Sequence, residues 1–177
     1  MNLFDLNTNK ITMNIDGKDI VMNPAVCYGK VYDKWLLSEC GKVWSIKKMK
    51  VIFGYKKYSF LKNSKYLKSI VYTVMVDEED FWGDGSSSLH IAGYQWKREI
   101  SCHKMIMDTF KPLYDNPPEG ISWDTWENIR DYPDNLKFYS ESVHIDHIDN
   151  NPLNNYLSNL RRVTPWDNNP TRKAKGI

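Results

Sequence analysis

Three polar side chains toward the C-terminal end of the chain have the types needed to hydrolyse a phosphodiester bond. Asp146 and His147 are adjacent, and Asn168 follows 21 residues after the histidine. The carboxylate of Asp146 and the amide oxygen of Asn168 are hard ligands, which favour Mg²⁺ or Mn²⁺ over zinc. His147, on the other side of the backbone from Asp146, is suited to act as a general base. We therefore expect one divalent cation per chain, which would stabilise the charge that builds on a phosphate.

Two strands, a long connection and the start of a helix must bring these side chains together. Strand-like residues 142–147 and 160–163 flank a twelve-residue connection rich in Asn and Pro, which suits a packed hairpin loop. A threonine cap at Thr164, a proline at the first helical position and a carboxylate at the third then begin a helix. The end of the first strand and the first turn of this helix would supply the two oxygen ligands.

This stretch resembles the His-Asn-His (HNH) nuclease motif with its ββα-metal fold, in the variant found in phage and intron homing endonucleases. The residues that carry the resemblance are 143–168, VHIDHIDNNPLNNYLSNLRRVTPWDN. The resemblance implies that Asp146 is a metal ligand, that His147 is the general base, and that Asn159 is the central asparagine, which braces the loop and orients the histidine. Asn168 stands where the motif's final histidine would be, and several members of the variant use asparagine there as the second metal ligand.

Two upstream segments resemble the same family. Residues 35–45 are similar to its N-terminal module, in which a small sheet contacts DNA, and residues 101–112 are similar to the helix that precedes the nuclease motif. The implied fold class is α+β, with an N-terminal antiparallel sheet module, a helix and a C-terminal ββα-metal motif. We expect a β-rich, lysine-rich DNA-binding module at 1–100, a helix and acidic connector at 101–142, and the nuclease motif at 143–177.

The net charge of +2 is a cancellation of charged blocks. Residues 30–70 hold eleven lysines against two acids, a net +9, and aromatic residues lie between the lysines. Residues 71–90 and 112–142 each carry −5, and the tail from Arg161 carries +4. Such blocks can be solvated faces, but a basic, aromatic surface also suits phosphate binding. Together with the motif, they predict double-stranded DNA as the partner, with contacts from Lys42, Lys47, Lys48, Lys50, Lys56, Lys57, His103, Lys104, Arg161 and Arg162.

Hydrophobic periodicity and turn residues predict the supporting elements. Strands are expected at residues 35–37, 42–46, 71–76 and 95–101. Helices are expected at residues 102–110 and 123–129. A turn at Cys40–Gly41 joins the first two strands, Lys111–Pro112 stops the first helix, and Ser122 or Asp124 caps the second. Residues 83–88, rich in Gly and Ser, are expected to form a mobile loop.

Composition argues against several classes of protein. No apolar run approaches the ~20 residues of a membrane span, and the N-terminus lacks a basic segment followed by an apolar one. The three cysteines form no Cys-x-x-Cys pair, which argues against a disulfide framework or a Cys-rich zinc site and favours a reducing cytosol. We therefore expect a cytoplasmic protein, and the family resemblance implies that it acts in a bacterial host and is encoded by a phage or a mobile element.

Three features depart from the family pattern. The connection of about thirty residues over 113–142 is long, acidic and Trp-containing, and it could be a spacer, a partner surface or a DNA-mimicking brake. Pro170 should limit the motif's helix to about one turn. The end of the chain at Ile177 leaves no room for a C-terminal DNA-reading module, so sequence recognition is expected to be short, relaxed or supplied by a partner.

The expected activity is that of a homing-type endonuclease that nicks one DNA strand. One site per chain implies that a monomer on DNA cuts one strand, although a homodimer is possible. The first alternative is a dimeric HNH restriction-type nuclease that makes double-strand breaks. The second is a DNA-binding protein whose nuclease centre has decayed, and the third is a purely structural ββα unit whose lysine face serves a protein or RNA partner.

Overall fold

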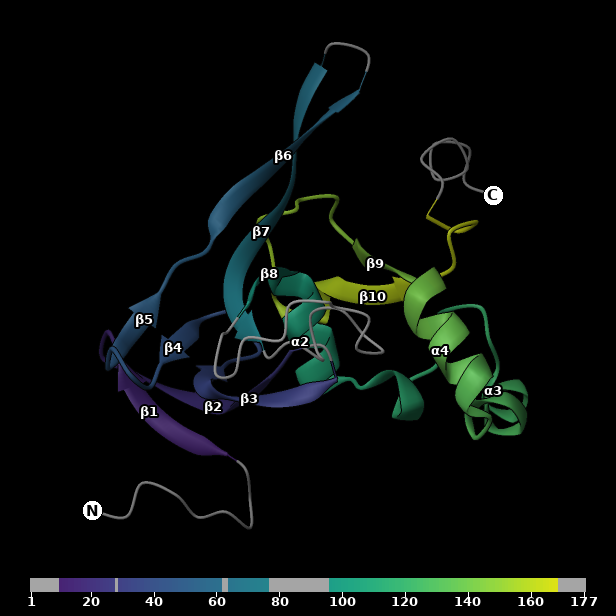
Figure 1. Cartoon of the computed structure of the whole chain (residues 1–177), viewed down its shortest axis with the longest axis horizontal. Helices are drawn as coiled ribbons and strands as arrows, with labels where there is room; N and C mark the ends of the chain where they lie inside the picture. Colours follow the sequence, from purple (N-terminus) through teal and green to yellow (C-terminus); the bar gives the residue numbers. More distant parts are fainter. Residues whose placement is uncertain (1–9, 28, 62–63, 77–95, 169–177) are drawn as a thin grey trace.

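The computed structural model describes residues 10–27, 29–61, 64–76 and 96–168. In this part of the chain, antiparallel sheets surround one short helix, and a pair of further helices lies to one side (Figure 1). The predicted α+β class with an N-terminal sheet module is confirmed. Among the helices of the described part, none combines the length and the apolar character that a membrane span requires.

The first sheet is an antiparallel meander. Its strands follow chain order: β1 (Ile11–Ile15), β2 (Lys18–Cys27), β3 (Lys30–Leu37), β4 (Val43–Ser45) and β5 (Lys50–Ile52). The two strands expected around the Cys40–Gly41 turn are the end of β3 and β4. Gly41 has φ of +80°, where a residue with a Cβ atom is strained, and its N–H donates to the Ser38 carbonyl at 2.9 Å.

The second sheet has three strands, β6 (Tyr55–Leu61), β7 (Ser64–Val76) and β8 (Trp96–Ser101), in that order. The strands expected at 71–76 and 95–101 are both present, but β7 begins seven residues earlier than expected. Its first half pairs with β6 and extends away from the body of the molecule as a two-stranded ribbon (Figure 1). The first half lacks a continuous apolar run, so sequence periodicity did not reveal it. The loop expected at 83–88 lies outside the described residues.

Helix α2 (Cys102–Phe110) follows β8 directly and has the predicted bounds. It buries the four side chains of Cys102, Met105, Ile106 and Met107. These side chains belong to one hydrophobic cluster, which also contains residues of the first sheet and of β7 and β8, and Leu160 near the C-terminal end of the described chain. The helix ends where the Lys111 N–H donates to the Met107 carbonyl at 2.9 Å, just before Pro112. Helix α2 thus packs against the two sheets on one side and against the motif's hairpin on the other.

The acidic connector is folded. It contains a 3-10 turn, η1 (Leu113–Asp115), and helices α3 (Trp123–Arg130) and α4 (Pro133–Ser142). Trp126 is fully buried, its Nε1 donates to the Tyr114 carbonyl at 2.9 Å, and its ring meets Tyr139 edge-on. Ser122 caps α3 by accepting the Thr125 N–H at 3.2 Å, as predicted. Helix α4 was not predicted, because it buries none of its residues and therefore shows no apolar stripe.

The motif's hairpin consists of β9 (His144–His147) and β10 (Leu160–Val163), which pair antiparallel, with a 3-10 turn, η2 (Leu157–Asn159), just before β10. Strand β9 begins two residues after the expected start, because α4 runs through Ser142. After β10, Thr164 Oγ1 accepts the Asp167 N–H at 3.2 Å, and the Asn168 N–H donates to the Thr164 carbonyl at 3.0 Å. These bonds form one capped helical turn up to Asn168.

Candidate active site

The register of the hairpin decides where each predicted site residue points. Asp146 lies opposite Arg161 across the strand pair. Because side chains alternate along a strand, His144 and Asp146 share one face of β9, and Ile145 and His147 share the other. Ile145 packs against the main hydrophobic cluster, which presses the His147 face toward α2. The predicted base and the predicted metal ligand therefore occupy opposite faces of one short strand.

His147 is only 9% exposed, and its Nε2 lies 3.1 Å from Asn155 Oδ1. The Asn155 amide nitrogen faces two backbone carbonyls, those of Leu153 at 3.3 Å and Pro152 at 3.5 Å. These contacts place the amide oxygen of Asn155 next to the histidine ring. Because an amide oxygen can only accept a hydrogen bond, the ring nitrogen must be the donor. Nε2 of the neutral ring must then carry the hydrogen. Nδ1 keeps its lone pair and is the atom able to take a proton.

His103, expected as a DNA contact, packs against the ring of His147. The two ring centroids are 5.3 Å apart and the planes are nearly perpendicular. In the described structure Nδ1 of His103 is buried without a hydrogen-bond partner. Burial, followed by the charges of His147, Lys104 and Lys68, lowers the pKa of His103 to about 4. A neutral imidazole therefore flanks the candidate base at neutral pH.

Asn159, predicted to brace the loop, bonds to one residue near the start of the loop and to one in its middle. Its Nδ2 donates to Asp149 Oδ1 at 2.9 Å and to the Asn154 carbonyl at 2.8 Å. Its Oδ1 accepts the Asp149 N–H at 3.1 Å. Hydrogen bonds from the Asn154 side chain, the Asn151 N–H and Asn159 lower the pKa of Asp149. The loop is thus ordered around one carboxylate that accepts several donors.

The ring of His147 is contacted by Asn155, a residue that the sequence reasoning missed. Asn155 is 7% exposed, and its position next to Asn154 in an Asn-rich loop was the signal that could have singled it out. The loop is also fixed from outside, because the Leu157 N–H donates to the Glu39 carbonyl at 2.8 Å. A Cβ atom at Gly41 would lie 3.3 Å from the Asn155 Cβ and carbonyl oxygen. The turn of the first sheet therefore supports the residue that holds the histidine.

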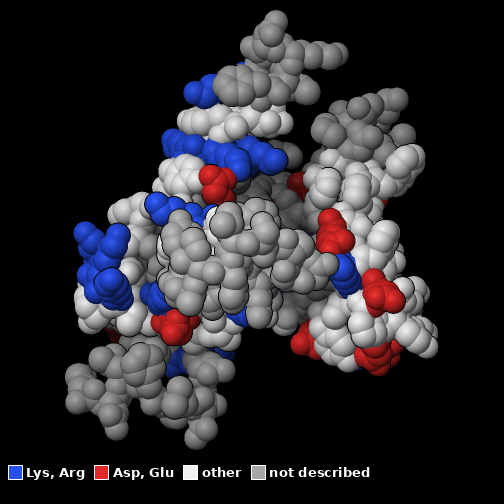
Figure 2. All heavy atoms as spheres, in the orientation of Figure 1, with Lys and Arg blue, Asp and Glu red and all other residues white. Residues whose placement is uncertain are grey.

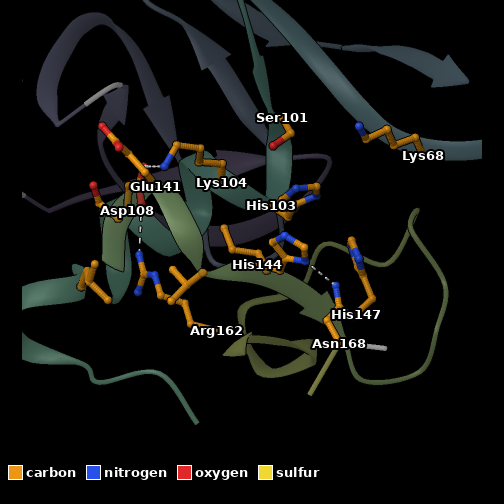
Figure 3. A pocket seen from close by; sticks show the side chains of 14 residues that line it. Lys68, Ser101, His103, Lys104, Asp108, Glu141, His144, His147, Arg162 and Asn168 are labelled. Atoms are coloured by element: carbon orange, nitrogen blue, oxygen red, sulfur yellow. Dashed lines mark hydrogen bonds and ion pairs between the residues drawn. The ribbon is translucent and has the colours of Figure 1, made fainter. Parts of the chain in front are cut away.

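Asp146 and Asn168 are the expected cation ligands. Asp146 is 8% exposed, and its Oδ2 accepts a hydrogen bond from Nε of Arg161 at 3.0 Å and forms an ion pair with Nη2 of the same guanidinium, also at 3.0 Å. The Asn168 Nδ2 lies 3.0 Å from His144 Nδ1, which brings Asn168 to the β9 face that also carries Asp146 (Figure 3). A carboxylate and an amide oxygen on one face suit Mg²⁺ or Mn²⁺. In the described ranges no cluster of three or more His, Cys, Asp or Glu side chains could hold a metal ion, so these two oxygen donors are what the hairpin offers.

A cavity of about 550 Å³ opens beside β9 (Figure 3). Its lining includes His147, which is the expected base, and Asn168, which is one of the two expected cation ligands, together with His103. Two cations also line it, Lys104 from α2 and Lys68 from β7, and they lie on either side of His103 in this view. Lys104, an expected DNA contact, also pairs with Asp108 at 3.1 Å. Lys68 was absent from the expected DNA contacts, and only its place in the lysine-rich block pointed to it.

The lysines expected to contact DNA from the sheets divide into two groups. Lys47 and Lys48 line a groove of about 420 Å³ together with Phe53, which is 89% exposed. Five of the lysines are exposed, namely Lys47, Lys48, Lys50, Lys56 and Lys57. Two of the six pair with acids: Lys42 with Asp16 at 3.3 Å, and Lys57 with Glu99. The four lysines that form no such pair in the described structure are therefore the more available for phosphate.

The two arginines of β10 alternate across the strand. Arg161 pairs with Asp146 and, through Nη1, with Glu119 at 2.8 Å. Burial lowers the pKa of Arg161, but the hydrogen bond to Asp146 and the charge of Glu119 outweigh this and raise it. Arg162, an expected DNA contact, is 5% exposed and donates to Asp108 at 3.1 Å and to the Lys111 carbonyl. Because its face of β10 packs on α2, Arg162 ties the strand to the helix, and its expected contact with DNA stays a prediction.

Comparison of the whole chain with known proteins gives little information about its function. No protein-family model and no curated protein matches this chain. Among solved structures, the chain is similar to one described as "DNA binding and cleavage by the HNH homing endonuclease I-HmuI", with 20% sequence identity and a TM-score of 0.39. The match covers 80% of this chain and 53% of that one, so this chain spans about half of its length. We therefore argue the function from the side chains of the site.

Proposed function

We propose that this protein is a DNA endonuclease of the HNH type, which uses one divalent cation to hydrolyse a phosphodiester bond and nicks one strand. The observation that carries the proposal is the state of His147. Its ring is held by Asn155 with the lone pair on Nδ1, and it lies on a strand that also bears Asp146. A base with a defined tautomer beside a hard-oxygen site is the combination that phosphodiester hydrolysis requires.

In this mechanism His147 takes a proton from the attacking water at Nδ1. Asn155 accepts the hydrogen bond from Nε2 and so keeps the ring in the orientation and tautomer that leave Nδ1 basic. Asn159 holds the loop that carries Asn155. Asp146 and Asn168 would hold Mg²⁺ or Mn²⁺, and such an ion supplies charge stabilisation to the phosphate and to the leaving oxygen.

The charge distribution supports DNA as the substrate. Figure 2 shows basic side chains mainly over the sheets, while most acidic side chains lie on the opposite side, over α3 and α4. Lys68 and Lys104 continue the basic region into the cavity of the site. Phosphate groups of a duplex would follow this basic surface and avoid the acidic helices. Double-stranded DNA lying across the sheets and the cavity mouth is the arrangement that these charges favour.

The test is a plasmid-nicking assay with the purified chain and Mg²⁺ or Mn²⁺. Supercoiled DNA should become open circular, and His147→Ala should slow this by at least about a hundredfold, since a general base contributes roughly 10²–10⁴. Added imidazole should restore part of the rate by replacing the missing base. The variant's melting temperature and DNA affinity serve as controls for folding and binding. An unchanged nicking rate in His147→Ala would contradict the mechanism.

The other products of the same assay distinguish the alternatives. Linear DNA that forms without an open-circular intermediate, from a protein with a dimeric mass, would indicate a restriction-type dimer. Salt-sensitive DNA binding without cleavage in either metal would indicate a DNA-binding protein with an inactive centre. Each of these outcomes would overturn the proposed nicking activity.

A further inference from the structure

The acidic connector contacts Arg161 of the site through Glu119. Its backbone N–H donates to the Arg162 carbonyl at 2.8 Å, and residue 119 forms a parallel bridge with Val163. The preceding Pro118 is buried. Glu119 is therefore held against the outer edge of β10, where its side chain reaches Arg161.

The Arg161 guanidinium lies between two carboxylates from different parts of the chain. Nε donates to Asp146 Oδ2 at 3.0 Å, Nη2 forms an ion pair with the same oxygen at 3.0 Å, and Nη1 donates to Glu119 Oε2 at 2.8 Å. All three guanidinium nitrogens are thus engaged, and the fork geometry fixes the plane of the group. Asp146 is nearly buried and Glu119 is exposed, so the arginine spans from the interior of the site to solvent.

The arrangement has an electrostatic consequence for a cation at Asp146. A unit positive charge within hydrogen-bond distance of the carboxylate repels an incoming divalent ion and competes for the same oxygen. The negative charge of Glu119 on the far side of the guanidinium offsets part of that repulsion. Glu119 also holds the guanidinium through a hydrogen bond of its own while the same group pairs with Asp146.

We propose that Arg161 and Glu119 set the affinity of Asp146 for a divalent cation: Arg161 competes with the cation, and Glu119 weakens that competition. The inference rests on the proposed function, because it takes Asp146 to be a cation ligand. It assigns the connector a positioning role at the site, which neither its length nor its acidity revealed. The connector is then part of the metal centre and more than a spacer.

The experiment measures Mn²⁺ binding to the full chain without DNA, by electron paramagnetic resonance of the free ion and by calorimetry. Arg161→Gln should bind Mn²⁺ about tenfold or more tightly, because a positive charge a few ångströms from the ion is removed. Glu119→Gln should bind it about threefold to tenfold more weakly, since a more distant negative charge is lost. The two substitutions must shift the affinity in opposite directions.

Matched substitutions in α3 provide the controls. Arg130→Gln and Glu127→Gln change the net charge of the protein by the same amounts, but neither residue has a contact with Asp146 among the bonds of the described structure. Both should bind Mn²⁺ as the unaltered protein does. Melting temperatures confirm that each variant is folded before its affinity is compared.

Two results would overturn the inference, and a third would separate it from the proposed function. Unchanged Mn²⁺ affinity in both Arg161→Gln and Glu119→Gln would show that the pair does not tune the site. Weaker binding in Arg161→Gln would show that the arginine supports the ligand and does not compete. If Asp146→Ala leaves Mn²⁺ binding intact, the proposed cation site itself is wrong; if it abolishes binding while the other variants bind normally, only the present inference fails.

Discussion

At the scale of single residues, the site depends on which atom of each side chain meets its neighbour. The Asn155 amide could offer either an oxygen or a nitrogen to His147, and its contacts with two carbonyls assign the oxygen to the ring. The two adjacent arginines of β10 have similar chemistry but opposite surroundings, one between carboxylates and one against α2. Residue type therefore predicts what a side chain can do, and local geometry decides what it does.

His103 leads to a prediction on pH dependence at this scale. Its pKa is lowered to about 4 in the folded protein, first by burial, whereas a histidine in the unfolded chain titrates near about 6.5. Between these two pH values the unfolded state therefore binds a proton that the folded state does not bind. The free energy of unfolding consequently decreases as the pH falls from ~6.5 to ~4. The whole shift corresponds to about 3 kcal/mol.

The measurement compares urea unfolding of the unaltered protein and of His103→Gln between pH 7.5 and pH 4. Glutamine stays neutral throughout, so the variant lacks this proton linkage. The stability of the unaltered protein relative to the variant should decline by up to about 3 kcal/mol over that range. A relative stability that stays constant from pH 7.5 to pH 4 would show that His103 titrates normally.

At the scale of elements, a turn in the first sheet and the loop of the hairpin are mutually dependent. Gly41 has positive φ and faces Asn155 closely, and the Leu157 N–H donates to the carbonyl of Glu39, two residues before Gly41. The loop that holds His147 is thus built on a turn more than a hundred residues earlier in the chain. A change in that turn should disturb the histidine without touching it.

Gly41→Ala tests this dependence, and Gly17→Ala is its matched control. Both glycines have φ near +77° to +80°, but a Cβ atom at Gly17 meets nothing within 4 Å, whereas at Gly41 it meets Asn155 at 3.3 Å. Each substitution should cost about 1–2 kcal/mol of stability from the backbone conformation alone. Gly41→Ala should cost about 1 kcal/mol more and should shift the imidazole ¹⁵N resonances of His147. Equal losses in the two variants, with unchanged resonances, would mean that the turn does not support the site.

The sequence predicts the elements whose signals are local. The Cys40–Gly41 turn, the bounds of α2 and the Ser122 cap each depend on a few neighbouring residues, and each is found as expected. Helix α4 and the ribbon half of β7 have no apolar periodicity, and so they escaped prediction. Contacts that join distant segments escaped it as well.

The candidate site follows the same rule. The types and spacing of Asp146, His147, Asn159 and Asn168 single out the hairpin. Asn155 and Glu119 gain their importance only from where the folded chain places them, 8 and 42 residues from their partners in sequence. The Asn-rich loop offers a weak local signal for Asn155, whereas the contact of Glu119 arises from tertiary packing, and no local pattern in the sequence indicates it.

At the scale of the whole molecule, charge is separated between the sheets and the acidic helices (Figure 2). The cavity of the site lies between them, with Lys68 and Lys104 on its sheet and α2 walls and Glu141 on its α4 wall. A duplex approaching the site would therefore meet phosphate-binding side chains on one side and repulsion on the other. In the proposed function, the separation would orient the DNA as well as attract it.

This separation predicts how single lysines contribute to DNA affinity. Each phosphate contact releases counterions, so the slope of log K against log salt concentration should fall in magnitude by about 0.9 when one contact is lost. Lys68→Gln removes a cation that lines the cavity, and Lys137→Gln removes one from α4 on the acidic side. Both make the same change in net charge. Fluorescence anisotropy of a labelled duplex at several salt concentrations, without divalent metal, should show the smaller slope only for Lys68→Gln. Equal slopes for the two variants would mean that net charge alone attracts DNA, and that the cavity has no phosphate bound at Lys68.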